Sequence, residues 1–315
     1  MAEVLIMGEM LVEIMRPEVG TELYEEGLFK GPYPSGAPAI FIDTVARLGH
    51  ETAIIGGVGK DDFGKNILDR LKKDGVNCEY VLESDDRATG VAFVTYFEDG
   101  SRKFIFHMGN TPAVEAKMPD LSKFKDVKYF HIMGCSLMSN EKFAQEILKT
   151  MHELIKQGTK VSFDPNIRKE LLVNDSIYEI VDEVLENTNV LLPGVEELLI
   201  LTGEDTIEKA VKKIFENPNL EVLALKNGSK GSKVYTREQE VEMGVYEVEQ
   251  LDATGAGDCF DGAFIAGLVE EKDILTAAKM GAAAGALNAT SFGPMEGKIS
   301  VDSINNVIRE DKVKK

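Results

Sequence analysis

Residues 251–260 combine two glycines with a carboxylate at the start of a helical pattern. Gly255 and Gly257 let the backbone approach a ligand closely, and the amides of these glycines and of Ala256 would lie at a helix N-terminus that favours an anion. Asp258 would then lie in the first helical turn, where its carboxylate can accept the proton of an attacking hydroxyl group. The pattern predicts phosphoryl transfer with Asp258 as the base. The alternative is a glycine-rich turn in which Asp258 only caps the helix.

The elements that must position these residues alternate between strand and helix along the chain. Such an alternation implies right-handed crossovers and a mostly parallel central sheet with helices on both faces, in a single α/β domain spanning residues 1–315. We expect strands at 4–8, 52–57, 127–132, 160–163, 190–192 and 220–226, and helices at 37–48, 63–73, 141–156, 177–186, 256–270 and 274–289.

Two segments interrupt this alternation, at about residues 11–34 and 88–110. Apolar and polar residues partly alternate in 91–96 and 103–107, and a turn at 98–101 joins them. Strand pairs inserted between strand–helix units do not easily join a parallel sheet, so we expect a small separate sheet that acts as a lid over the site. The alternative is a meander at the edge of the main sheet. Unpaired strands of a lid can pair between subunits, which favours a homodimer.

Composition narrows the class of protein further. The chain has 315 residues and a formal net charge of −19, which makes nucleic acid an improbable partner because a phosphate-backbone binder needs a positive field. The three cysteines form no CxxC pair and suggest a reducing compartment, so we expect a cytoplasmic protein. The sequence contains no run of about 18 apolar residues, so we expect no membrane span. The charged tail, 309–315, is expected to fray.

Three other site types lack their sequence patterns. The Walker pattern GxxxxGK[ST] is absent, since Asp61 follows Gly59 and Lys60. No GxGxxG follows the first strand, which argues against a dinucleotide site. The four histidines show no HExxH spacing, which argues against a zinc hydrolase.

The residues around Asp258 resemble the C-terminal signature of the ribokinase-like carbohydrate kinases, the phosphofructokinase-B family. That signature reads D-x-[TN]-G-A-G-D-x-F, and it matches residues 252–260 here. The family usually has Thr where this chain has Ala253. A second family signature, G-x-V-G-x-D-x-x-G, matches residues 56–64. The resemblance runs from Gly8 to about Asn288 and implies a ribokinase-like α/β fold with a small β-sheet lid.

The resemblance also implies roles on the nucleotide side, with ATP as the phosphoryl donor. Asp258 is expected to deprotonate the acceptor hydroxyl, and the amides of residues 255–257 to form the anion hole. Residues 226–231 resemble the ATP loop, and Asn288 is similar to a residue that flanks adenine. The expected ATP contacts are Lys226, Gly228, Ser229, Gly231, Gly255, Gly257 and Asn288.

Two cations follow from the same resemblance. Glu197 matches the family glutamate that acts on Mg²⁺ through water, although Gly194 stands where the family has Asn. Magnesium bridging the phosphates is a chemical requirement of this reaction. A possible K⁺ site resembles the family's monovalent-cation loop, at Asp252, Ala253, Ser291 and Gly293.

The acceptor side departs most from the family. Glu13 stands where the family often has Asp, and Ile40 stands where it has Asn, in the segment that also contains Gly36 and Ala37. Arg168 is similar to an arginine that faces the acceptor pocket. Family members that phosphorylate 2-keto-3-deoxygluconate also tend to carry an arginine on the lid-side strand.

At that place on the lid-side strand we expect His107 instead. Because bidentate capture of a carboxylate favours Arg, this histidine favours a neutral ketohexose such as fructose or tagatose as the acceptor. The alternatives are a 2-keto-3-deoxygluconate kinase, a nucleoside kinase and a non-catalytic sugar sensor. The resemblance therefore implies a carbohydrate kinase, a phosphotransferase with an alcohol group as acceptor.

Overall fold

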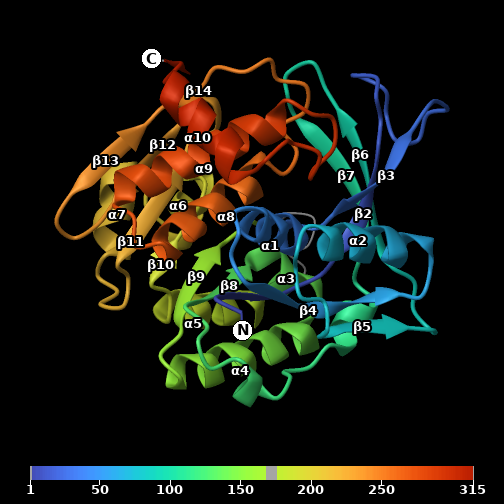
Figure 1. Ribbon diagram of the computed structural model, residues 1–315, viewed down its shortest axis with the longest axis horizontal. Coiled ribbons are helices and arrows are strands. Elements are labelled where there is room, and N and C mark those ends of the chain that lie inside the picture. Colours follow the sequence, from blue (N-terminus) through green and yellow to red (C-terminus); the bar gives the residue numbers. More distant parts are fainter. Residues whose placement is uncertain (1, 168–175, 315) are drawn as a thin grey trace.

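The computed structural model describes residues 2–167 and 176–314, and its largest element is a nine-stranded sheet (Figure 1). The strand order is β13-β12-β11-β10-β9-β8-β1-β4-β5, and every neighbouring pair from β11 to β5 is parallel. The edge strands β12 and β13 run antiparallel. The strands are β1 (Val4–Met7), β4 (Thr52–Gly59), β5 (Val81–Ser84), β8 (Tyr129–Met133), β9 (Lys160–Asp164), β10 (Val190–Leu191), β11 (Val222–Lys226), β12 (Ser232–Tyr235) and β13 (Glu240–Met243).

Helices cover both faces of this sheet, as the alternating pattern predicts. Successive residues of β1 show why: Val4 and Ile6 belong to one buried cluster, and Leu5 and Met7 to the other. The first cluster includes side chains of α1 (Ala37–Arg47), α2 (Asp62–Lys73), α8 (Ala256–Val269), α9 (Ile274–Ala289) and α10 (Val301–Glu310). The second includes side chains of α3 (Gly134–Ser139), α4 (Glu141–Lys156), α5 (Ser176–Glu186), α6 (Val195–Thr202) and α7 (Ile207–Ile214). Short 3₁₀ turns occupy Pro112–Glu115, Leu121–Lys123 and Gly228–Lys230.

A second sheet of four strands stands apart from the main one, at the upper right of Figure 1. Its order is β3-β2-β6-β7, and its strands are β2 (Leu11–Met15), β3 (Lys30–Ser35), β6 (Gly90–Tyr96) and β7 (Arg102–His107). The outer pairs are antiparallel and the central β2–β6 pair is parallel, so two hairpins lie side by side. The expected small separate sheet is confirmed, and we call it the small sheet below.

The described part of the C-terminal tail, up to Lys314, forms a strand where we expected fraying. Strand β15 (Val313–Lys314) pairs antiparallel with β14 (Val245–Tyr246), and this pairing satisfies backbone groups that fraying would leave to water. Among the described residues, no helix combines the length and the apolar composition that a membrane crossing requires.

Candidate active site

The carboxyl ends of five neighbouring parallel strands deliver polar side chains to one edge of the main sheet. Open α/β folds bind ligands at this edge, because the chain leaves the strands there through loops. Each of the strands β1, β8, β9, β10 and β11 contributes one such residue, either at its end or in the segment that follows it, and all five residues line one cavity of about 280 Å³: Glu9, Cys135, Asp164, Glu197 and Lys226.

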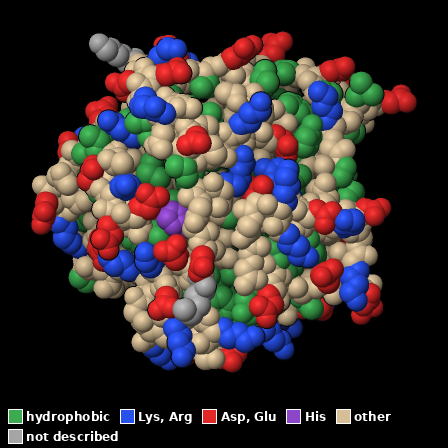
Figure 2. Space-filling model, viewed as in Figure 1, with side chains coloured by type: hydrophobic (Ala, Val, Ile, Leu, Met, Phe, Trp, Pro, Cys, Tyr) green, Lys and Arg blue, Asp and Glu red, His purple; other side chains and the backbone are tan. Residues whose placement is uncertain are grey.

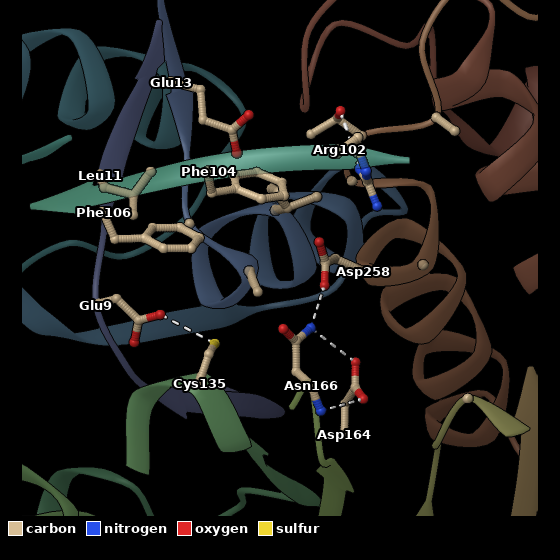
Figure 3. A pocket seen from close by; sticks show the side chains of 18 of the residues that line it. Glu9, Leu11, Glu13, Arg102, Phe104, Phe106, Cys135, Asp164, Asn166 and Asp258 are labelled. Atoms are coloured by element: carbon tan, nitrogen blue, oxygen red, sulfur yellow. Dashed lines mark hydrogen bonds between the residues drawn. The ribbon is translucent and has the colours of Figure 1, made fainter. Parts of the chain in front are cut away.

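The small sheet forms another wall of this cavity (Figure 3). Its contribution comes from β2 and β7, and the first turn of α8 lies beside it. The lining residues from these parts are Leu11, Glu13, Arg102, Phe104, Phe106, Thr254, Gly255, Gly257 and Asp258. The cavity therefore brings together segments from the two ends of the chain.

Asp258 lies in the first turn of α8 and lines the cavity, as the sequence pattern requires. The residue is 8% exposed, and Asn166 Nδ2 donates a hydrogen bond to Asp258 Oδ1 at 3.2 Å. Gly255 precedes the helix with a φ of 76°, and a Cβ added there would lie 2.3 Å from the Pro294 carbonyl oxygen. A Cβ added at Gly257 would meet open space. The turn therefore needs glycine at 255, whereas glycine at 257 leaves room in the cavity.

A buried charge cluster lies behind the base. Asn166, whose backbone is left-handed with a φ of 39°, also donates to Asp164 Oδ2 at 3.3 Å. Lys226 Nζ donates to the same Asp164 oxygen at 3.0 Å and to Asp261 Oδ2 at 2.7 Å. A chain of hydrogen bonds thus runs from Lys226 through Asp164 and Asn166 to Asp258.

Protonation in this cluster is uneven. Burial alone would raise the pKa of Asp164, but the Lys226 ammonium and hydrogen bonds hold it below its ordinary value. Burial raises the pKa of Asp261 well above its ordinary value, and Lys226 offsets this only in part. Lys226 therefore stabilises the charged form of Asp164 more fully than that of Asp261. The sequence pattern did not single out Asp261, since it reads as an ordinary helical residue.

Two more carboxyl groups lie at the acceptor side of the cavity. Glu13 is buried, and Ser35 Oγ donates to Glu13 Oε1 at 2.7 Å. Burial raises the pKa of Glu13 to about 7, while the Ser35 hydrogen bond and the Arg102 charge oppose the shift. Glu9 is 2% exposed and accepts hydrogen bonds from Cys135 Sγ at 3.2 Å and from Ser136 Oγ. The expected acceptor residues at the start of α1 also line the cavity: Gly36, Ala37 and Ile40.

The structure corrects the expectation for β7. His107 is exposed on the outer face of the small sheet, with its ring edge-on to Phe93 at 6.3 Å between centroids. Alternate residues of β7 face the cavity instead, beginning with Arg102, because successive side chains of a strand point to opposite faces. The small sheet thus carries an arginine toward the cavity at a position that the sequence pattern did not indicate, and the argument from His107 for a neutral acceptor no longer holds. Arg168, the other expected acceptor contact, lies outside the described residues.

A second hollow of about 520 Å³ adjoins the first and is open to solvent. Three expected ATP-loop residues line it, namely Lys226, Gly228 and Ser229. Gly231 is placed differently, since it has a φ of 92° and a Cβ there would lie 2.2 Å from the Met243 carbonyl oxygen. It shapes the turn into β12.

Asn288 is also placed differently from the expected adenine contact. It is fully buried, its Nδ2 donates to the Thr254 carbonyl at 2.8 Å, and its Oδ1 accepts from the Gly297 amide at 3.3 Å. Its side chain therefore ties the loop before α8 to the loop after α9.

Glu197 lies between the two hollows and lines both. Its Oε1 accepts from the Ile167 amide and its Oε2 from the Gly194 amide, both at 2.7 Å. Each oxygen keeps a second lone pair, so Glu197 fits a role toward Mg²⁺ through water. Among the described residues, no group of three or more His, Cys, Asp or Glu side chains is arranged to hold a metal ion.

The carboxylate of Asp252 is occupied by protein donors. Its Oδ1 accepts from the Thr254 amide at 2.9 Å, from Thr254 Oγ1 at 2.7 Å and from the Tyr96 hydroxyl at 3.1 Å, and its Oδ2 accepts from the Gly293 amide at 3.0 Å. The Ser291 amide donates to the Asn288 carbonyl at 3.2 Å. These bonds hold the expected K⁺ loop together, and a cation there stays a prediction.

Comparison with known proteins agrees with this geometry. The model of the pfkB family carbohydrate kinases matches residues 1–300. The fructokinase of Solanum tuberosum is 33% identical over 272 residues, which cover 85% of this chain and 81% of that protein. Fructokinase-1 of Oryza sativa subsp. japonica is 31% identical over 300 residues, which cover 92% of each chain.

Solved structures give the same result. An E. coli protein provisionally named Ribokinase II, solved in complex with ATP and Mg²⁺, has 38% sequence identity and a TM-score of 0.92, covering 98% of this chain and 100% of that one. A fructokinase from Vibrio cholerae O395, solved with fructose, ADP and calcium, has 24% identity and a TM-score of 0.82, and shows the shared ribokinase-like fold. Because the family model spans nearly the whole chain and the relatives exceed 30% identity over most of it, the chain belongs to the pfkB family of carbohydrate kinases.

Proposed function

We propose that this sugar kinase transfers the γ-phosphoryl group of ATP to a hydroxyl group of a neutral ketohexose such as fructose or tagatose. The observation that carries the proposal is the position of Asp258. Asp258 directly follows residues 255–257 at the start of α8 and lines a cavity that adjoins the hollow lined by the expected ATP loop. The Ala256 amide donates to the Ala253 carbonyl at 3.2 Å, so an anion would bind mainly through the amides of Gly255 and Gly257. This placement puts a proton acceptor and an anion-binding helix start at one point.

The mechanism follows from this placement. The acceptor hydroxyl oxygen attacks the γ-phosphorus, the bond from phosphorus to the ADP oxygen breaks, and ADP keeps the electron pair. The hydroxyl proton moves to Asp258, which Asn166 orients. The amides at the start of α8 stabilise charge on the transferring group. Magnesium, when bound, neutralises phosphate charge, and Glu197 would contact it through water.

Two observations support a neutral acceptor. The relatives from Solanum tuberosum and Oryza sativa are fructokinases. In the described part of the cavity, the carboxyl groups of Glu9 and Glu13 can accept hydrogen bonds from the hydroxyl groups of a neutral sugar. The cavity's described cations, Arg102 and Lys226, instead contact Thr254 and Asp164 near the phosphoryl end.

An ATP-consumption screen tests the proposal with fructose, tagatose, ribose, 2-keto-3-deoxygluconate and common nucleosides at equal concentration. We expect the highest kcat/KM with a ketohexose. A preference for 2-keto-3-deoxygluconate or for a nucleoside would replace the proposed acceptor class. Tight sugar binding without turnover by any compound would indicate a sensor and would contradict the kinase mechanism.

We also propose that the protein acts in the cytoplasm as a homodimer. ATP as donor and three well-separated cysteines support the location. The outer face of the small sheet supports the dimer, because Phe29, Phe93 and Ile105 form an apolar surface there. Phe29 and Ile105 are 40% and 44% exposed.

A further inference from the structure

Arg102 begins β7 and directs its guanidinium group toward Asp258 in the cavity (Figure 3). The guanidinium donates to Thr254 Oγ1 at 3.3 Å and lies 5.7 Å from the centroid of the Phe104 ring. Both partners are uncharged, so these contacts position the cation without neutralising it. The carboxyl groups that line the same cavity near it are Glu13 and Asp258.

Arg102 contacts the loop that precedes α8. Arg102 pairs directly with Tyr96 in the β6–β7 register, and the Tyr96 hydroxyl lies 2.9 Å from the same Thr254 Oγ1 and donates to Asp252 Oδ1. Thr254 immediately precedes the amides of residues 255–257. One cross-strand pair of the small sheet therefore contacts the loop that presents the anion-binding helix start. This contact sets the guanidinium beside the point where the phosphoryl group would transfer.

We propose that Arg102 is a catalytic residue that binds the transferring phosphoryl group from the small sheet. The inference rests on the proposed function. As the bond from phosphorus to the ADP oxygen breaks and the bond to the acceptor oxygen forms, negative charge lies on the equatorial phosphoryl oxygens. A guanidinium presents several N–H donors in a fixed plane and matches those oxygens better than an ammonium does. Arg102 is exposed, so it acts fully only when substrates fill the cavity and exclude water.

The test compares Arg102→Gln and Arg102→Lys with a matched control, Lys103→Gln. Lys103 is the next residue of β7, lies on the opposite face and pairs with Glu22 at 2.9 Å. We expect Arg102→Gln to lower kcat by at least about 10²-fold, the size seen for loss of one transition-state donor. KM for the sugar and for ATP should change less than about threefold. The kcat of Arg102→Lys should lie between those of Arg102→Gln and the unmodified chain. The kcat of Lys103→Gln should match that of the unmodified chain.

A second measurement separates catalysis from ground-state binding. ADP with aluminium fluoride, in the presence of sugar and Mg²⁺, mimics the transferring phosphoryl group. We expect Arg102→Gln to lose affinity for this complex by a factor similar to its loss in kcat, while its affinity for ADP alone is unchanged.

Two outcomes would overturn the role of Arg102. One is a kcat of Arg102→Gln within about threefold of the unmodified chain. The other is a large rise in KM for the sugar alone, which would make Arg102 an acceptor contact. No turnover by the unmodified chain with any acceptor would instead overturn the proposed function itself, and the two failures are therefore distinguishable. Far-ultraviolet circular dichroism confirms that each variant is folded.

Discussion

At the scale of single residues, the chemistry depends on where a few carboxyl groups lie and which partners they have. Asp258 combines a helix start with a hydrogen bond from Asn166, a residue distant in sequence. Glu13 combines burial with a hydroxyl donor from the neighbouring strand. Each arrangement makes a definite prediction.

Replacement of Asp258 by Asn keeps the size of the side chain and removes its basicity. We expect kcat to fall by at least about 10²-fold, because general-base catalysis contributes on this order. KM for ATP should change little, since the ATP loop at residues 226–231 is untouched. A coupled ADP-release assay measures both values. Near-normal turnover would show that another group takes the proton.

The raised pKa of Glu13 gives stability a definite pH dependence. Its ordinary value is 4.5 and burial raises the pKa to about 7, so the folded state binds more protons than the unfolded state between these values. The contribution of Glu13 to stability therefore falls as pH rises through this range. We expect the Tm of Glu13→Gln, relative to the Tm of the unmodified chain, to be higher at pH 8 than at pH 5. Glu18→Gln, at an exposed position, is the control. An equal Tm difference at both pH values would rule out the buried titration.

At the scale of elements, the turn before α8 decides whether the site forms. Gly255 has a left-handed backbone with the Pro294 carbonyl close by, whereas Gly257 faces open space. Two glycines only two positions apart therefore have different reasons for being glycine.

Gly255→Ala and Gly257→Ala should separate folding from activity. We expect Gly255→Ala to destabilise the fold by at least roughly 1–2 kcal/mol, the cost of a left-handed backbone for a residue with a Cβ. Gly257→Ala should keep its stability, because alanine suits a helix, and should lose activity because its methyl group enters the cavity. Measurements of Tm and of kcat distinguish the two variants. Full activity of Gly257→Ala would remove this part of the cavity wall from the reaction.

The sequence predicted elements well where periodicity is strong. The expected helices at 37–48 and 256–270 appear as α1 and α8, with ends that differ by one residue. The face of β7 was misjudged because Phe104, Ile105 and Phe106 are apolar on both sides of the strand, so alternation does not reveal the inward face.

For site residues, too, prediction succeeded where the signal is local in the sequence and failed where it is not. Those inside one continuous motif, such as Gly255 and Asp258, could be predicted because a helix start places them together. Partners brought together by tertiary contacts, such as Arg102 with Thr254, have no local signal. Asn288 lies in an alanine- and glycine-rich helix, where a buried amide that clamps two loops looks like any polar helical residue.

At the scale of the whole molecule, the net charge and the exposed apolar surface bear on different kinds of partner. The net charge of −19 is spread widely, and Figure 2 shows basic side chains scattered in small groups between acidic ones over the viewed face. A net negative charge of this size repels the phosphate backbone of nucleic acid.

The apolar outer face of the small sheet predicts self-association. We expect Ile105→Glu to shift the protein from dimer to monomer in light scattering coupled to gel filtration, because the new charge would be buried at the interface. Tyr178→Glu on α5, another exposed position at 52%, is the control and should leave the mass unchanged. A monomeric unmodified chain would contradict the dimer.

Four residues belong to the walls of both hollows: Gly194, Glu197, Lys226 and Gly228. The two hollows thus share a stretch of wall in which two of the four residues are glycines. A compound that joins a polyol head to a purine nucleotide through a short phosphate tether would fill both hollows and gain from the linkage as an effective concentration. The shared wall makes such two-headed inhibitors a natural chemical route to blocking this enzyme.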